Sequence, residues 1–243
     1  MTDNRCYAGM MLSRKLAGEF LGTAFLLAVV IGSGIMGERL AGGNIAIALL
    51  GNTLATGAGL VALILTFGPI SGAHFNPAVT LSDVWFGQIH WRHGAMYVVA
   101  QVAGAFAGVA AAHGMFGEAM FFASQHVRTG PSQWWSEFVA TFGLLAVIIS
   151  CSRNRPASTP FAVAAYITAA YWFTSSTSFA NPAVTLARAA SDTFAGIRPQ
   201  DAPGFIVAQL LGAATAVIVF KWLFASEKEV SPYGNQAGTT RND

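Results

Sequence analysis

Long stretches of the chain contain no charged side chain, and their lengths predict helices that span a membrane. Asp, Glu, Lys and Arg are absent from residues 20–37, 40–82, 93–117, 138–152, 156–187 and 202–220. The apolar core of a bilayer is about 30 Å thick and requires about 20 apolar residues in a helix. The pattern therefore predicts six spans, at residues 16–36, 45–68, 94–114, 134–152, 160–176 and 204–224.

Composition excludes several other classes of protein. Of the 243 residues, 54% are hydrophobic and only 10% are charged, whereas soluble domains carry about 25% charged residues. This excludes an ordinary cytosolic enzyme and a disordered protein. The net charge of +2 is too small to indicate a nucleic-acid partner. Two cysteines, Cys6 and Cys151, do not form a disulfide framework. The remaining class is a polytopic membrane protein.

The distribution of Lys and Arg predicts the orientation of the chain. With six spans, both termini lie on the same side of the membrane. That side collects nine basic residues, which are Arg5, Arg14, Lys15, Arg92, Arg153, Arg155, Lys221, Lys228 and Arg241. The opposite side has four, which are Arg39, Arg128, Arg188 and Arg198. Because cytoplasmic loops carry an excess of Lys and Arg, we expect cytoplasmic tails at residues 1–13 and 225–243.

Three short motifs recur in the same order in the two halves of the chain. They begin at Glu19 and Glu137 (Glu-Phe followed three residues later by Thr), at Asn76 and Asn181 (Asn-Pro-Ala-Val-Thr-Leu), and at Gln101 and Gln209 (Gln followed three residues later by Gly-Ala). This indicates a duplication, with halves at 14–115 and 132–224 in a single channel domain over 1–243. Each half has three spans, so the second half is inverted relative to the first. Inverted repeats place the functional site near the membrane midplane, between the halves.

The two Asn-Pro-Ala motifs predict short helices that begin inside the membrane. Asn is a favoured helix N-cap, and Pro is favoured at the first helical position. Residues 77–87 and 182–194 are too short to span, so each is predicted to be a re-entrant half-helix. The preceding segments, 72–75 and 177–180, would then expose carbonyl groups to a water-filled path. The alternative, that each Asn-Pro pair caps an ordinary helix, is disfavoured because the motif occurs twice in inverted halves.

These motifs are typical of one family, and the chain resembles the aquaporins, or major intrinsic proteins, over residues 14–224. The resemblance rests on the two Asn-Pro-Ala motifs, on Glu19 with Thr23, on Glu137 with Thr141, on Ser-Gly-Ala-His at 71–74, and on Gln101 and Gln209. It implies an all-α membrane protein with six transmembrane helices and two half-helices. It also implies a homotetramer in the lipid bilayer with one pore per subunit, multi-pass in the cell (inner) membrane. Passage of neutral solutes is passive, with no catalysis, cofactor or metal.

The resemblance also assigns pore residues. The Asn-Pro-Ala residues at the centre are Asn76, Pro77, Ala78, Asn181, Pro182 and Ala183. Family spacings place the four-residue selectivity filter at Thr56, Ala169, Ser178 and Val184. Other pore-lining positions are Gly72, Ala73, His74, Thr177 and Phe179, and residues expected to hold the half-helix loops are Glu19, Glu137, Gln101 and Gln209.

The filter departs from the family pattern. Val184 occupies the position where the family normally has Arg, and Thr56 and Ala169 are small where water-selective members have an aromatic residue and His. Pore diameter, hydrogen-bonding groups and fixed charge determine selectivity, so we expect a wide pore without the filter Arg. This pattern resembles bacterial aquaporins associated with arsenic resistance. It implies permeation by arsenous acid and methylated arsenicals, with water and glycerol. The alternatives are a general glycerol and urea facilitator, a secondary transporter and a structural membrane protein.

Two features near the filter admit other interpretations. Arg188 lies one helical turn beyond Val184 and could replace the missing charge, but we expect it instead to extend to the membrane interface or to pair with a carbonyl group. Tyr171, Trp172 and Phe173 are expected to pack against other helices, because three consecutive residues cannot all face one pore.

Overall fold

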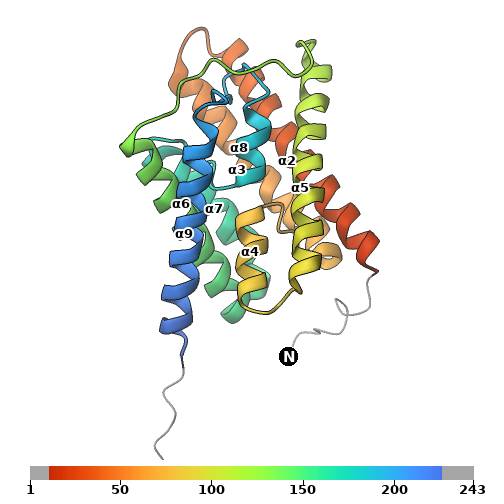
Figure 1. Cartoon of the computed structure of the whole chain (residues 1–243). Coiled ribbons are helices and arrows are strands. Elements are labelled where there is room, and N and C mark those ends of the chain that lie inside the picture. The colour runs from red at the N-terminus through yellow and green to blue at the C-terminus, as the bar shows by residue number, and fades with distance from the viewer. Residues whose placement is uncertain (1–10, 226–243) are drawn as a thin grey trace, which may run out of the picture.

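The structure is a computed structural model that describes residues 11–225. The predicted tails fall almost entirely outside this range, as do Cys6 and the tail residues Arg5, Lys228 and Arg241 of the orientation count. The described part is all-helical (Figure 1). Its helices are α2 (Leu12–Leu40), α3 (Ile45–Ser71), α4 (Pro77–Trp85), α5 (Trp91–Phe116), α6 (Pro131–Asn154), α7 (Thr159–Phe173), α8 (Pro182–Arg188) and α9 (Ala202–Leu223), with a 3-10 turn at Pro156–Ser158.

The predicted all-α membrane fold is confirmed. Five helices, α2, α3, α5, α6 and α9, are long and apolar enough to cross a membrane. The sixth, α7, has 15 residues and ends at Phe173 rather than at 176. It ends there because Thr174 leaves the helical conformation, with its hydroxyl donating to the Ala170 carbonyl. We call the side where α2 begins and α9 ends the terminal side, and the opposite side the far side (Figure 1).

Each half of the chain packs around a close approach of two long helices. In the first half α2 contacts α3 and α5, and in the second half α6 contacts α7 and α9. Glycines allow this approach: a Cβ atom at Gly104 would lie 2.3 Å from the Phe20 carbonyl oxygen, and one at Gly212 would lie 2.4 Å from that of Phe138. Small residues at helix contacts are typical of membrane proteins. The equivalent placement of the two glycines follows the internal repeat.

The half-helices α4 and α8 begin at the centre of the molecule and extend towards opposite sides (Figure 1). They contact each other, and each also contacts a long helix of the other half, α4 against α9 and α8 against α5. Both are shorter than predicted, since α4 ends at Trp85 and α8 at Arg188. After α8 the chain turns back, and the Ile197 amide donates to the Arg188 carbonyl. The sequence pattern contained no signal for that turn.

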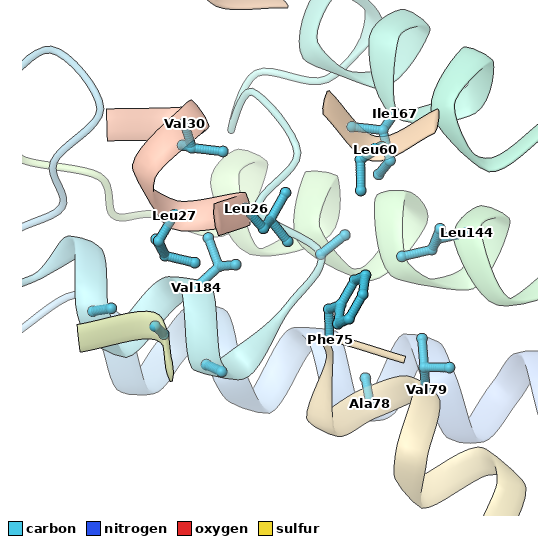
Figure 2. Packing of buried hydrophobic residues seen from close by; sticks show 14 of the residues in the cluster. Leu26, Leu27, Val30, Leu60, Phe75, Ala78, Val79, Leu144, Ile167 and Val184 are labelled. Carbon is cyan, nitrogen blue, oxygen red and sulfur yellow. The ribbon is translucent and has the colours of Figure 1, made fainter. Parts of the chain in front are cut away.

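Part of the main hydrophobic cluster forms the wall of a central cavity. Leu26, Val30, Leu60, Leu144 and Ile167 belong to the main hydrophobic cluster, and all five line the cavity. Figure 2 shows them on helices that surround a common space, with Phe75 and Val79 of the first half-helix region below them. The fold therefore places an apolar path along the half-helices.

Candidate transport pore

The two half-helices are joined at their N-termini by a reciprocal pair of hydrogen bonds. Nδ2 of Asn76 donates to the Ala180 carbonyl, and Nδ2 of Asn181 donates to the Phe75 carbonyl, each over 2.7 Å. The two Oδ1 atoms accept from the first amides of their own helices. Both Asn side chains line the cavity. The positive ends of two helix dipoles therefore point at the middle of the path.

Unlike the two asparagines, the Pro and Ala residues of the Asn-Pro-Ala motifs do not line the cavity. Pro77, Ala78, Pro182 and Ala183 are buried, and they are not among the residues that line the cavity. They begin the half-helices and pack within the molecule. Of the six Asn-Pro-Ala residues, only the two asparagines face the path.

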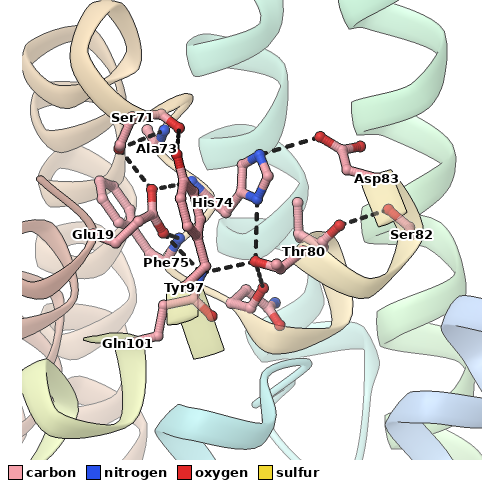
Figure 3. A network of polar contacts seen from close by, with 12 residues as sticks. Glu19, Ser71, Ala73, His74, Phe75, Thr80, Ser82, Asp83, Tyr97 and Gln101 are labelled. Carbon is pink, nitrogen blue, oxygen red and sulfur yellow. Dashed lines mark hydrogen bonds and ion pairs between the residues drawn. The ribbon is translucent and has the colours of Figure 1, made fainter. Parts of the chain in front are cut away.

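Glu19 holds the first re-entrant loop from within α2. Its fully buried carboxylate accepts hydrogen bonds from the amides of His74 (3.0 Å) and Phe75 (2.8 Å), and from the side chains of Ser71 and Gln101 (2.6 and 2.7 Å). Gln101 also donates to Thr80 of α4. Figure 3 shows this network between α2, the loop and α5. A buried charge is tolerated when hydrogen bonds surround it.

Glu137 repeats this arrangement in the second half. Its carboxylate accepts from the amides of Phe179 and Ala180, both at 2.9 Å, and from Gln209 at 2.6 Å. Gln209 in turn donates to Thr185 of α8. Both carboxylates thus hold a loop, and both glutamines connect that carboxylate to a half-helix.

Both loops contain non-glycine residues in the left-handed backbone region. Ala73 and Phe75 have φ of 52° and 49°, and the equivalent Ser178 and Ala180 have 49° and 47°. Such conformations cost of order 1–3 kcal/mol each and persist only where the surroundings impose them. The amides of His74 and Phe75 donate to Glu19, those of Phe179 and Ala180 donate to Glu137, and these hydrogen bonds hold the two loops in place.

Most of the other predicted lining residues face a cavity. Gly72, Ala73, His74 and Phe179 line the central cavity, and Thr177 lines a second cavity on the far side.

The filter prediction is wrong at Ala169. Thr56, Ser178 and Val184 line the central cavity, whereas Ala169 is exposed on the outer surface of α7. The cavity-facing side of α7 consists of Thr159, Val163, Ile167 and Tyr171, which are spaced four residues apart and share one helix face. The Tyr171 hydroxyl lies 3.4 Å from Oγ1 of Thr56.

The expectation that Tyr171 only packs is therefore also wrong, and a large side chain occupies the position assigned to Ala169. Trp172 and Phe173 are half-exposed on the outer surface. Arg188 likewise does not extend to the interface: it is 2% exposed and lines the cavity.

The terminal side of the cavity carries charged groups. His74 lies 3.1 Å from Asp83 of α4 and 3.1 Å from the hydroxyl of Thr80 (Figure 3). Asp83 lines the cavity together with Arg153 and Lys221. The central cavity has a volume of about 820 Å³, and these charged side chains are at its terminal-side end.

Comparison with known proteins identifies this arrangement. The family described as Major intrinsic protein matches residues 8–171 and 155–242. The chain belongs to the major intrinsic protein family. Its members are passive channels for small solutes rather than enzymes, and this multi-pass membrane protein is one of them.

Relatives of this major intrinsic protein include other channels of the aquaporin type. It is 53% identical to aquaglyceroporin AqpS of Rhizobium meliloti over 219 residues, covering 90% of this chain and 94% of that protein. It is 39% identical to aquaglyceroporin-3 of Trypanosoma brucei brucei over 106 residues, covering 43% of this chain and 33% of that protein. The fold is similar to that of the aquaglyceroporin from Plasmodium falciparum (TM-score 0.67, 22% identity, covering 86% and 96% of the two chains).

Two lining residues of this major intrinsic protein were missed or misjudged from sequence. Tyr171 could have been found from the four-residue spacing of Val163, Ile167 and Tyr171, which indicates one helix face. The assignment of Ala169 to the filter rested on its spacing from Asn181 along the chain. That spacing gives a position in the sequence but does not say which face of α7 points into the cavity. For Arg188 the four-residue spacing from Val184 indicated a shared helix face, but the sequence contained no signal for its burial, which depends on the turn that follows α8.

Proposed function

We propose that this channel carries small neutral solutes, namely water, glycerol, arsenous acid and methylated arsenicals, through a filter in which Val184 replaces the usual Arg. The observation that carries the proposal is the position of Val184 in the cavity wall beside Thr56 and Ser178. An isopropyl group there gives an apolar surface where a guanidinium would bind hydroxyl groups and narrow the path.

The midplane supports selection for neutral solutes. Asn76 and Asn181 are the polar side chains at the centre, and both are uncharged. Each half-helix contributes roughly half a positive elementary charge at its N-terminus. A cation that loses its hydration shell there gains no compensating carboxylate, whereas a neutral hydroxyl can accept from the Asn amides. Arsenate is an anion at pH 7 and is excluded by the cost of removing its water.

The wall favours solutes with both hydroxyl and methyl groups. Arsenous acid is neutral at pH 7 and presents hydroxyl groups as a small polyol does. Methylated arsenicals replace hydroxyls by methyl groups, which are better matched to a wall of Leu26, Val30, Leu60 and Ile167 than to an Arg-lined ring. Tyr171 limits the width of the filter, so the proposal rests on the apolar character at Val184 more than on an open diameter.

Tracer uptake into proteoliposomes tests this proposal. Val184→Arg is expected to reduce uptake of methylated arsenicals several-fold more than uptake of arsenous acid or glycerol. Ala169→Leu is the matched control, because its side chain is on the outer surface of α7 and should leave all fluxes unchanged. Wild-type protein that conducts glycerol but no arsenical above empty vesicles would refute the arsenical proposal.

A general facilitator for glycerol and urea is the second candidate, favoured by the likeness to proteins named aquaglyceroporins. The ratio of glycerol to arsenous acid permeability separates the two. A secondary transporter would show saturable flux that depends on a proton or sodium gradient, and a structural protein would show no flux at all.

We further propose that the channel is a single domain that forms a homotetramer in the inner membrane of the cell, with both termini cytoplasmic. Large apolar side chains exposed on the outer surface, such as Leu50, Leu54, Phe161, Trp172 and Leu211, require lipid or another subunit to cover them. Mass measurement in detergent tests the assembly, and protease access to the tails in oriented vesicles tests the orientation.

A further inference from the structure

Arg188 is situated where two cavities meet. The central cavity extends from Lys221 and Phe224 at the end of α9 to Arg188 at the end of α8. A second cavity of about 300 Å³ lies on the far side, between residues such as Glu38, Asn52 and Arg128. Among the residues that the structure describes, Arg188 is the one that lines both of them. The boundary between the cavities is the natural place for a constriction.

The position of the Arg188 guanidinium is determined by two contacts. Its Nε donates to the carbonyl of Ala195 in the loop after α8, and its guanidinium carbon lies 3.4 Å from the centre of the Phe179 ring. That ring packs edge-on against Phe205 of α9, so it cannot move freely. The side chain is therefore held in one orientation, as a selective site requires.

Arg128 provides a second cation near the same ring. Its guanidinium carbon lies 5.3 Å from the centre of the Phe179 ring, and its side chain donates to the carbonyls of Gly196 and Ser176. No carboxylate forms an ion pair with Arg128 or Arg188 within residues 11–225. The far-side entrance to the central cavity thus has two guanidinium groups without an ion-pair partner among the described residues, and Glu38 is the one carboxylate residue among those that line the second cavity.

Arg188 and Ser178 both have hydrogen-bonding groups without a partner among the described residues. The only side-chain hydrogen bond that Arg188 makes to residues 11–225 is the one from Nε, so its two terminal NH2 groups have no protein acceptor. Ser178 is 3% exposed, lines the central cavity, and its hydroxyl has no partner among the described residues. Buried polar groups without a partner are rare and indicate a site completed by water or a ligand.

We infer that Arg188 is the cation barrier and solute-binding arginine of this filter, one helical turn outward from the family position now occupied by Val184, and that Ser178 is the second hydroxyl-binding group. Four residues of helix correspond to about 6 Å along the path. The filter therefore combines an apolar ring at Val184 with a separate constriction at Arg188. The apolar ring acts on the methyl groups of the solute, and the constriction acts on its charge and its hydroxyl groups. The inference rests on the proposed channel function for neutral, hydroxyl-bearing solutes.

The charge of Arg188 and its NH2 groups have different expected effects on transport. The positive charge repels cations and protons, while the NH2 groups bind solute hydroxyls in a planar, two-donor geometry that Lys does not reproduce. Arg188→Leu should therefore admit cations, whereas Arg188→Lys should continue to exclude them but conduct glycerol less well.

The test measures cation and glycerol flux in proteoliposomes that contain wild type, Arg188→Leu, Arg188→Lys or the control Arg39→Leu. Arg39 is also on the far side, but it is half-exposed, pairs with Glu118 and lines neither cavity. We expect at least a tenfold rise in potassium or proton leak for Arg188→Leu only. The double variant Val184→Arg/Arg188→Leu should restore exclusion, because it returns the charge to the family position. If Arg188→Leu does not fold, Arg188→Gln replaces it with the same expectation.

Failure of the inference about Arg188 can be distinguished from failure of the proposed channel function. A wild type that conducts glycerol, together with Arg188→Leu and Arg188→Gln variants as cation-tight as wild type, overturns the inference and leaves the channel function intact. A wild type with no glycerol flux above empty vesicles overturns the proposed function itself.

Discussion

Replacing Gly212 by Ala should destabilise the protein, although Ala normally stabilises a helix. A Cβ atom at this position would lie 2.4 Å from the carbonyl oxygen of Phe138 on α6, and 3.2 Å from its carbonyl carbon. The obstacle is backbone, which cannot rotate away as a side chain could. The two helices α6 and α9 must therefore separate.

The size of the effect follows from three contributions. Overpacking a close contact costs about 1–3 kcal/mol, and the helix propensity of Ala returns about 1 kcal/mol. Separation of the helices also weakens the hydrogen bonds from Gln209, one turn away on α9, to Glu137 and Thr185, each worth about 1 kcal/mol or more. The net loss is about 3 kcal/mol. For a protein of this size that corresponds to a fall in Tm of roughly 6–12 °C.

Thermal unfolding of the purified protein in detergent measures this loss. The matched control is Gly114→Ala in α5, where a Cβ atom would meet nothing within 4 Å. That variant should keep or slightly raise the Tm. Gly104→Ala should behave like Gly212→Ala, because its Cβ would lie 2.3 Å from the Phe20 carbonyl oxygen. A Gly212→Ala protein as stable as the Gly114→Ala protein would refute the close packing of α6 and α9.

Three further predictions concern the path and its far-side loop. In an Arg188→Leu background, Asn76→Asp or Asn181→Asp should raise the cation current in planar bilayers further, because a carboxylate offsets the half-helix dipoles; currents equal to that of Arg188→Leu alone would contradict the midplane barrier. Tyr171→Ala should increase the flux of polyols larger than glycerol in stopped-flow swelling, and equal flux would mean that Tyr171 does not limit the width. Burial raises the pKa of Asp201, but hydrogen bonds from Arg198 and the Arg128 amide outweigh it and lower that pKa below its usual value. The Asp201 carboxylate therefore stabilises the folded protein at pH values above the pKa that this group has in the unfolded chain. That stabilisation is lost as the pH falls through the lower pKa of the folded state. Asp201→Asn should therefore reduce the loss of protein stability at acid pH.

The repeat made the pore architecture accessible from the sequence. Each half-helix is specified by its local sequence, because Asn caps its first turn and Pro begins it. The same Asn-Pro-Ala motif occurs in both halves of the chain. Charge-free stretches specified the spans, since bilayer thickness sets helix length. The family assignment, which the comparisons confirm, rests on these same residues.

The reciprocal hydrogen bonds at the midplane belong to the tertiary structure alone. Asn76 donates to a carbonyl in the second half and Asn181 to one in the first, so neither bond exists until the halves pack. The same holds for the left-handed residues of the loops, such as Ser178 and Ala180, which are not glycine and contain no local preference for φ near 49°. Glu137, on a distant helix, holds this loop by accepting from the amides of Phe179 and Ala180.

By itself the sequence determined the all-helical membrane fold, the inverted halves and the place where the half-helices begin, because these depend on apolar length and on local capping. Only the tertiary structure decided which residues face the path. A helix face depends on how α7 is rotated against α3 and α6, which brings in Tyr171 and turns Ala169 outward. The burial of Arg188 depends on a turn after α8 and on the Phe179 ring, contacts between segments that no local pattern encodes.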